Sequence, residues 1–229
     1  MDAMTGTSKP NATSGSTLEY VVDTLRQGIL SGRLVPGQRL VEADLTRQLG
    51  VSRGPVRESF RRLSAEGLVE SIPNQTTMVR RYSKAEMLEL FEIRAELEAL
   101  AARRAAECMD DPAAKARFLQ AIGPIWDEHS LAAGPSYFDE NRRFHQAIAD
   151  LSANTQLAEL IRKLQLPLIM FQLGGAITPQ AIQASIDEHR RIAQAIVDGN
   201  RRKAAAEVKA HLKRACEMVE RMPPDIFRP

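Results

Sequence analysis

The 229-residue chain has little of what several classes of protein require. Its two cysteines, Cys108 and Cys216, are too few for a disulfide scaffold or a four-cysteine zinc site. The longest apolar run, residues 164–177, is broken by glutamine, proline and a glycine pair, and it is shorter than the ~20 residues of a membrane span. The first residues lack the apolar core of a signal peptide. We therefore expect a cytoplasmic protein that does not contact a membrane.

Lysine is absent from residues 17–82, although this stretch contains ten arginines and seven acidic residues and thus carries a formal charge of +3. The whole chain carries only +2, so its positive charge is concentrated in the N-terminal third. Arginine is the side chain suited to bidentate contacts with phosphate and guanine. A formal charge of +3 is also what a solvated basic surface would carry. Charge alone therefore does not identify a nucleic-acid-binding protein.

The N-terminal third has the pattern of a winged helix-turn-helix. Residues 1–16 are rich in small polar residues and predict a flexible tail. Apolar spacing then predicts helices at residues 18–31, 42–49 and 52–65, and strands at residues 68–72 and 77–82. Gly50 predicts a left-handed residue at the end of the second helix, and Ser52 predicts an N-cap for the third. We assign the resulting domain to residues 17–82.

The third of these helices has the pattern of a recognition helix. Arg53, Arg57 and Arg61 recur every four residues and therefore share one face. Apolar residues occupy the opposite face, at Val56, Phe60 and Leu63. A helix that enters the major groove needs this division, with its N-terminal residues at the base edges and its free N–H groups near phosphate. A solvated amphipathic helix would have a similar pattern, but the preceding short helix and the hairpin favour DNA recognition.

These residues resemble the DNA-binding domain of GntR-family transcription regulators. The resemblance covers about residues 18–82 and is carried by GRLVPG (32–37), LTRQLGVSRGPVRE (45–58) and EGLV (66–69). It implies that Arg53 and Arg57 contact operator bases or phosphates, and that Ser52 and Gly54 meet the DNA backbone. Ala43 stands where some relatives have a DNA-contacting arginine, and the wing tip, 73–76, lacks their glycine. We therefore assign the wing contacts to Asn74 and Gln75.

The remaining two thirds of the chain predict an all-α domain. Ser83 and Glu86 form a capping box that opens it, and Thr178 before Pro179 marks another helix start. The apolar spacing predicts a bundle of about six helices over residues 83–222, followed by a C-terminal tail at 223–229. Pro167 is expected to kink the fourth of these helices, and Trp126 is expected in the core. The fold class is therefore mainly α, a winged helix-turn-helix followed by a six-helix bundle.

Three histidines of this domain lie on the apolar stripes of three different helices. They are His145, His189 and His211. A single histidine on such a stripe is more often a hydrogen-bonded core residue, but three on facing helices can converge as bundle metal sites do. Three imidazoles and one oxygen donor suit zinc, nickel or another divalent transition metal. Asn141 lies one turn before His145 on the same face and is the candidate oxygen donor.

The C-terminal domain resembles the helical ligand-binding domain, called FCD, of the FadR-like branch of GntR regulators, in its shorter VanR-like form. The resemblance covers about residues 83–222 and is carried by NRRFH (141–145), DEH (187–189) and AHL (210–212). It implies that a divalent metal is bound beneath a small carboxylate effector. It also implies that an arginine on the first helix of the domain meets the effector carboxylate, and Arg94 is the matching position.

These patterns predict a homodimeric transcription regulator, a repressor, that reads a pseudo-palindromic operator in double-stranded DNA and responds to a small carboxylate. Two alternatives stay open at this stage. A three-histidine metal site with an open position could activate water for hydrolysis. The second alternative is an effector-independent DNA-binding dimer whose histidines are structural. A DNA-reading head is hard to explain on a hydrolase, so we expect no enzymatic activity.

Overall fold

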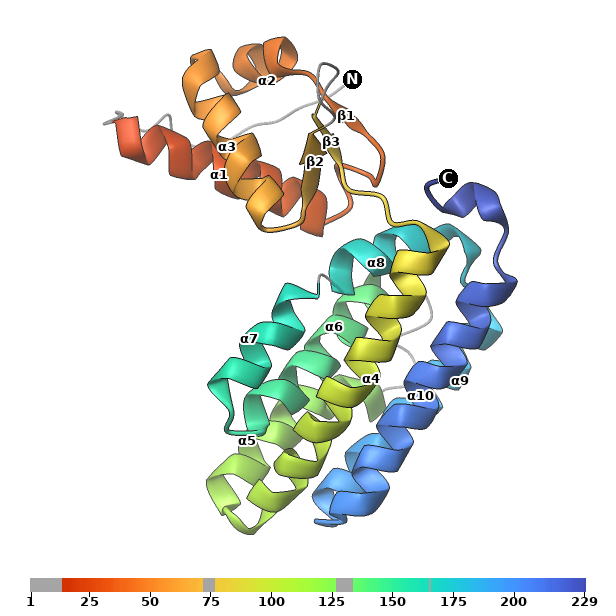
Figure 1. Cartoon of the computed structure of the whole chain (residues 1–229). Coiled ribbons are helices and arrows are strands. Elements are labelled where there is room, and N and C mark those ends of the chain that lie inside the picture. The colour runs from red at the N-terminus through yellow and green to blue at the C-terminus, as the bar shows by residue number, and fades with distance from the viewer. Residues whose placement is uncertain (1–13, 72–76, 127–133, 165) are drawn as a thin grey trace. The chain divides into compact units, whose positions relative to one another are not determined.

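The computed structural model describes residues 14–71, 77–126, 134–164 and 166–229. The chain divides into two compact units, Met1–Arg80 and Arg81–Pro229, which we call the N-terminal unit and the bundle (Figure 1). The predicted mainly helical fold class is confirmed. The division falls two residues before the expected boundary because Arg81 and Tyr82 bond to the bundle. Arg81 Nε donates to the Ile226 carbonyl at 3.1 Å, and Tyr82 N donates to Gln172 Oε1 at 2.8 Å.

The described part of the N-terminal unit contains helices α1 (Ser14–Leu30), α2 (Glu42–Leu49) and α3 (Arg53–Ala65). Helices α1 and α3 pack through fully buried apolar residues, among them Val21, Val22, Val56 and Leu63. Gly50 caps α2 with φ of 65°, the left-handed conformation that glycine adopts at low cost. Residues 14–16, expected in the tail, already belong to α1, and residues 1–13 lie outside the described part.

A three-stranded antiparallel sheet completes this unit. It contains β1 (Arg39–Leu40), β2 (Val69–Ser71) and β3 (Thr77–Val79) in the order β1-β3-β2. Strands β2 and β3 form the predicted hairpin, with Glu70 opposite Met78. Strand β1 was not predicted, because two residues are too few for a periodicity signal; Leu40 pairs with Thr77. The wing tip lies outside the described residues.

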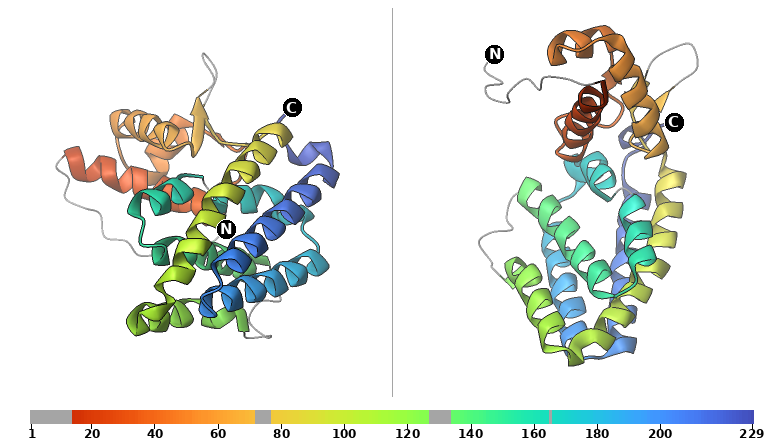
Figure 2. Two further views of the ribbon diagram at one scale, coloured as in Figure 1. Left: turned by 60° about the horizontal axis from the view of Figure 1, so that its bottom comes forward. Right: turned by 90° about the vertical axis from the view of Figure 1, so that its left-hand side faces the viewer.

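The bundle is built from antiparallel and crossing helices (Figures 1 and 2). Its α-helices are α4 (Lys84–Glu107), α5 (Pro112–Ile122), α6 (Gly134–Leu151), α7 (Thr155–Lys163), α8 (Leu166–Leu173), α9 (Pro179–Val197) and α10 (Arg201–Arg221). Short 3-10 turns follow at η1 (Cys108–Asp110), η2 (Gly123–Trp126), η3 (Gly174–Ala176) and η4 (Pro224–Ile226). The predicted capping box of Ser83 and Glu86 is present, and the Thr178 side chain caps α9.

Helices α4 and α10 lie side by side and antiparallel (Figure 1). Lys84, at the start of α4, donates to the Glu220 carbonyl near the end of α10, and Glu107, at the end of α4, pairs with Arg201, at the start of α10. The buried face of α4 is rich in alanine, with Ala99, Ala102, Ala105 and Ala106. Small side chains let helix backbones approach closely, and α4 and α10 together form one wall of the bundle.

Three details of the bundle differ from the sequence predictions. The predicted fourth helix is two helices, α7 and α8, so the described bundle has seven α-helices rather than six. Pro167 is the second residue of α8, where its missing backbone N–H cannot continue the hydrogen bonds of α7. Trp126 is not in the core; it is 48% exposed, with the Arg190 guanidinium 5.9 Å from its ring centroid. The expected C-terminal tail is anchored, since Phe227 is buried and Arg228 N donates to the Tyr82 carbonyl.

None of the described helices carries an uncharged apolar stretch of the length that crossing a bilayer requires.

Candidate functional site

Helix α3 presents a basic face and buries an apolar one. The side chains of Arg53, Arg57 and Arg61 are 72%, 64% and 78% exposed. Val56, Phe60 and Leu63 on the other side are buried in the core of the N-terminal unit. The division predicted from the sequence is therefore present in the structure. The exposed guanidiniums can reach a ligand without any change in the core.

The start of α3 leaves room for a backbone to approach. Ser52 is the N-cap residue, as predicted, but its side chain makes no capping hydrogen bond. A Cβ atom at Gly54 would meet no atom within 4 Å, so the packing of the protein does not require glycine there. A phosphate group can bind at a helix N-terminus that offers a hydroxyl, such as that of Ser52, and unpaired backbone N–H groups. The absence of a side chain at Gly54 lets the phosphate approach the backbone there. Asn74 and Gln75, the predicted wing contacts, lie outside the described residues.

Glu42, at the start of α2, contacts two arginines of the basic face. Arg57 Nε donates to Glu42 Oε2 at 2.7 Å, and Arg53 Nε lies 3.8 Å from Glu42 Oε1. The carboxylate therefore holds both guanidiniums above the N-terminal turn of α3. Sequence analysis did not single out Glu42, because a pair fifteen residues apart follows no helical spacing.

The three predicted histidines come together inside the bundle. His145 lies on α6, His189 on α9 and His211 on α10, and all three are at most 5% exposed. Their ring centroids are 4.9–5.3 Å apart, and one nitrogen from each forms a group within 4.8 Å of one another. Phe144 stacks on His189 with a centroid distance of 4.2 Å and fixes its ring. The convergence predicted from three separate stripes is present in the structure.

Two of the histidines are oriented by glutamates that are themselves held by arginines. His145 Nδ1 lies 2.6 Å from Glu98 Oε2, and Arg94 Nε donates to Glu98 Oε1 at 2.8 Å. His211 Nδ1 lies 2.7 Å from Glu188 Oε2, and Arg214 donates to both oxygens of Glu188. A carboxylate on one ring nitrogen fixes the tautomer and directs the other nitrogen toward a ligand.

The electrostatics of this cluster favour neutral imidazoles at His189 and His211 beside an ionised Glu188. Burial lowers the pKa of His189 well below its ordinary value, and the charges of the neighbouring histidines lower it further. Burial also lowers the pKa of His211 to about 4, although Glu188 opposes the shift. Burial alone would raise the pKa of Glu188, but the hydrogen bonds from His211 and Arg214 outweigh it and hold this pKa at about 2. A neutral imidazole is the form that binds metal.

The histidine cluster fits a metal ion. His145 Nε2 and His189 Nε2 are buried and have no hydrogen-bond partner in the described structure. Buried polar atoms are normally paired, so two unpaired nitrogens beside a third imidazole are an arrangement that a metal ion would satisfy. Nitrogens around tetrahedral zinc are about 3.4 Å apart, so the three imidazoles, whose nitrogens lie within 4.8 Å of one another, would have to draw closer to enclose an ion. Asn141, the predicted oxygen donor, is buried on the same face of α6 as His145.

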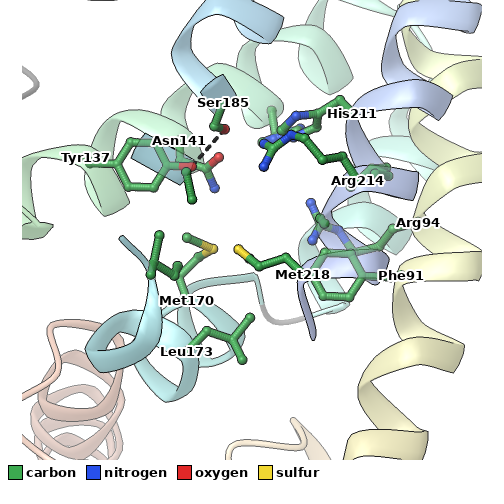
Figure 3. Close-up of a pocket in the computed structure, with 15 residues that line it drawn as sticks. Phe91, Arg94, Tyr137, Asn141, Met170, Leu173, Ser185, His211, Arg214 and Met218 are labelled. Atoms are coloured by element: carbon green, nitrogen blue, oxygen red, sulfur yellow. Dashed lines mark hydrogen bonds between the residues drawn. The ribbon is translucent and has the colours of Figure 1, made fainter. Parts of the chain in front are cut away.

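A pocket adjoins the cluster (Figure 3). Its lining includes Arg94, Asn141, His145 and His211, so it brings the predicted effector residue beside three of the four predicted metal residues. Its volume of about 30 Å³ is room for one or two water molecules. The sulfur ends of Met170 and Met218 face each other across it in Figure 3. A larger ligand therefore requires these flexible side chains to move.

Several residues of this site were missed by sequence analysis. Glu98 is four residues after Arg94 and could have been found by the helical spacing of ion pairs. Glu188 and Arg214 gave no such signal, because their contact joins α9 to α10. Tyr137 donates to Ser185 at 2.8 Å beside the pocket, a pair that only the packing of α6 against α9 creates.

The fold defines a winged helix-turn-helix unit followed by a helical bundle, the architecture of a DNA-binding regulator, and the family comparisons agree. Residues 17–79 match the model described as bacterial regulatory proteins, gntR family, and residues 89–214 match the FCD domain. The chain therefore belongs to the GntR family of bacterial regulators and carries an FCD domain. This family consists of transcriptional regulators rather than enzymes, so the hydrolase alternative is not retained.

Individual regulators are similar to this chain over most of its length. McbR of Escherichia coli is 29% identical over 195 residues, which cover 84% of this chain and 87% of the relative. The probable D-xylose utilization operon transcriptional repressor of Paenarthrobacter nicotinovorans is 29% identical and covers 84% of each chain. The solved structure of E. coli McbR/YncC superposes with a TM-score of 0.73 at 24% identity, covering 89% of this chain and 97% of that one.

Proposed function

We propose that this GntR-family regulator is a homodimeric repressor that binds a pseudo-palindromic operator through α3 and is controlled by a small carboxylate in the bundle. The proposal has two parts, a DNA interface and a sensory site. A repressor function is supported by the Paenarthrobacter relative, which is described as a probable transcriptional repressor. Two winged helices related by a two-fold axis would read two half-sites.

In the DNA interface, Arg53 and Arg57 contact base edges, and Arg61 continues the contact along the same face. Ser52 and Gly54 meet the phosphate backbone at the start of α3. The exposure of the three guanidiniums and the empty space around Gly54 support these roles. We assign the wing contacts to Asn74 and Gln75 on the sequence alone.

In the sensory site, His145, His189, His211 and Asn141 hold a divalent transition metal, zinc or nickel. The two orphaned imidazole nitrogens are the observation that carries this assignment. When bound, the ion supplies positive charge and an open coordination position for an oxygen ligand. Glu98 and Glu188 keep the imidazoles of His145 and His211 in the orientation that the ion needs.

Arg94 binds the effector carboxylate at the pocket wall. Its side chain is 2% exposed, and its Nε is used by Glu98, so the terminal nitrogens are left for a ligand. Effector binding changes operator affinity only to the extent that it favours one arrangement of the DNA-reading heads over another.

Calorimetry with a panel of small carboxylates, before and after chelation of metal, tests the sensory site. We expect heat of binding only with metal present, and a change in operator affinity on gel shift with the same compound. No metal by elemental analysis and no heat with any carboxylate would instead favour an effector-independent dimer with structural histidines.

The variant His145→Ala separates the two parts of the proposal. We expect it to lose metal and effector response but to bind the operator like the wild type in the absence of effector. Wild-type metal content in this variant would show that the ligand assignment is wrong.

A further inference from the structure

The pocket beside the histidine cluster is lined by two charged side chains within the described residues, and both are arginines. Arg94 projects from α4, and Arg214 projects from α10. In Figure 3 both guanidiniums point into the space between Phe91 and Asn141. The glutamates that pair with them, Glu98 and Glu188, are not part of the pocket lining. The pocket surface that meets a ligand is therefore cationic, although each arginine is paired with a glutamate that lies outside the pocket lining.

Each guanidinium keeps donors that the protein does not use. Arg94 gives its Nε to Glu98, and its two terminal nitrogens have no hydrogen-bond partner in the described part of the chain. Arg214 gives Nε and Nη2 to the two oxygens of Glu188 at 2.5 and 2.7 Å, which leaves Nη1. Arginine clamped on one side by a carboxylate is pre-organised to bind a second carboxylate on the other.

The balance of charge in the site calls for a dianion. Two arginines and two glutamates cancel, and the imidazoles are neutral when they bind metal. A divalent ion therefore leaves a net charge of about +2 in a largely buried site. A monocarboxylate would neutralise only half of this charge, and buried unpaired charge is costly.

We propose that the effector is a short dicarboxylate, with one carboxylate on Arg94 and the other on Arg214. This inference rests on the proposed sensory function and names its ligand class and a second effector-binding residue, Arg214. Ser185 and Asn141, which also line the pocket, can donate hydrogen bonds to further oxygens of such a ligand. Met170 and Met218 must rotate to admit it, because the cavity is smaller than any dicarboxylate.

The test compares succinate with its half-amide, succinamate, by calorimetry on the metal-loaded full-length protein. The two compounds have nearly the same shape and differ by one charge. We expect wild type to bind succinate on the order of tenfold to hundredfold more tightly, as a hydrogen-bonded charged pair implies. Malonate with malonamate and glutarate with glutaramate extend the comparison to shorter and longer chains.

Arg214→Gln is the diagnostic variant. We expect the metal-loaded variant to bind both compounds of a pair equally. Arg202→Gln, an exposed arginine near the start of the same helix, is the matched control and should keep the preference. Elemental analysis of each variant shows whether loss of the Arg214–Glu188 pair has also released the metal. The conservative variant Arg214→Lys should restore part of the preference for the dicarboxylate over its half-amide.

The outcomes separate this inference from the function on which it rests. Equal binding of dicarboxylate and half-amide by wild type, or a preference that survives in metal-loaded Arg214→Gln, overturns the inference and leaves the sensory function intact. Tighter binding of inorganic phosphate than of any dicarboxylate also overturns it, since one dianionic group would then suffice. Absence of binding by every carboxylate overturns both.

Discussion

The two units use arginine in opposite ways. In the N-terminal unit, Arg53 and Arg57 are 72% and 64% exposed and share one carboxylate at the surface. In the bundle, Arg94 is 2% exposed and its partner Glu98 is 4% exposed. An exposed pair contributes little to stability and is easily exchanged for a phosphate or a base. A buried pair cannot be broken without leaving a charge in a medium of low dielectric constant.

This difference matches the roles that we propose for the two sites. A DNA-reading face must release its intramolecular partners whenever the operator is bound, so weak, solvated ion pairs serve it. A sensory pocket must hold its polar groups in place before the ligand arrives, since reorganisation would reduce affinity. The same residue type therefore supplies a replaceable contact in one unit and a fixed scaffold in the other.

The largest effect is expected from Arg94→Met, which leaves Glu98 buried without its cation. We expect the bundle to lose about 3–5 kcal/mol of unfolding free energy. Denaturant unfolding followed by the fluorescence of Trp126, the only tryptophan of the chain, reports this unit. Arg103→Met, an exposed change on the same helix, should stay within about 0.5 kcal/mol of wild type.

A second substitution sharpens this result. Adding Glu98→Leu to Arg94→Met removes the stranded charge, so most of the lost stability should return. If the single variant loses less than about 1 kcal/mol, the burial of the pair does not control stability and the contrast with the surface arginines is wrong.

Metal removal should come next in size. An ion at a hundred times its dissociation constant stabilises the folded state by about 2.7 kcal/mol. For a unit of this size the melting temperature of the bundle should therefore fall by roughly 5–10 °C on chelation. Calorimetric melting with and without chelator measures the shift, and His189→Ala should abolish it. Equal shifts in wild type and His189→Ala would place the ion elsewhere.

Arg57→Ala should weaken DNA binding without affecting the bundle. We expect a loss of about 1–3 kcal/mol in operator binding and a relaxed base preference, because a bidentate contact with guanine is removed. Fluorescence anisotropy with operator and scrambled duplexes measures both quantities. Arg33→Ala, an exposed arginine of the same unit that lies outside α3, is the charge-matched control. Unchanged affinity and selectivity would show that α3 is not the recognition helix.

The smallest effect is expected from Glu42→Gln, which releases Arg53 and Arg57. An exposed ion pair is weak, so non-specific DNA binding should tighten by no more than about fivefold. Its salt dependence should be measured alongside, because free guanidiniums displace more counterions. Asp44→Asn, which frees only Arg47 on α2, is the control. Weaker binding by Glu42→Gln would instead show that Glu42 orients Arg57 for the operator.

Much of the fold followed from local patterns that act within one or two turns. The bounds of α2, the left-handed Gly50, the capping box at Ser83 and the cap at Thr178 were all predictable, because their causes lie within a few residues. The division between α7 and α8 and the exposure of Trp126 were predicted wrongly. The first depends on how completely a proline interrupts a helix, and the second on which neighbours happen to cover an aromatic ring.

The candidate site shows the same limit. His145, His189 and His211 were predictable because each marks the buried face of its own helix, and buried faces of a bundle meet. The sequence did not predict the distances between these histidines. Nor did it predict that Glu98 and Glu188 would contact two of them, or that Arg214 would line the pocket. Each of these depends on the rotation of one helix against another, which the periodicity of a single helix does not determine.

The sequence by itself determined the apolar face of α3, the helix ends at Gly50, Ser83 and Thr178, and the unit that carries the DNA-reading motif, since these properties depend on local spacing and on motif. The tertiary structure alone decided that Glu98 and Glu188 orient two imidazoles and that two arginines meet at one pocket. Helix spacing places a side chain on a face, but only packed helices decide which side chain of another segment it meets.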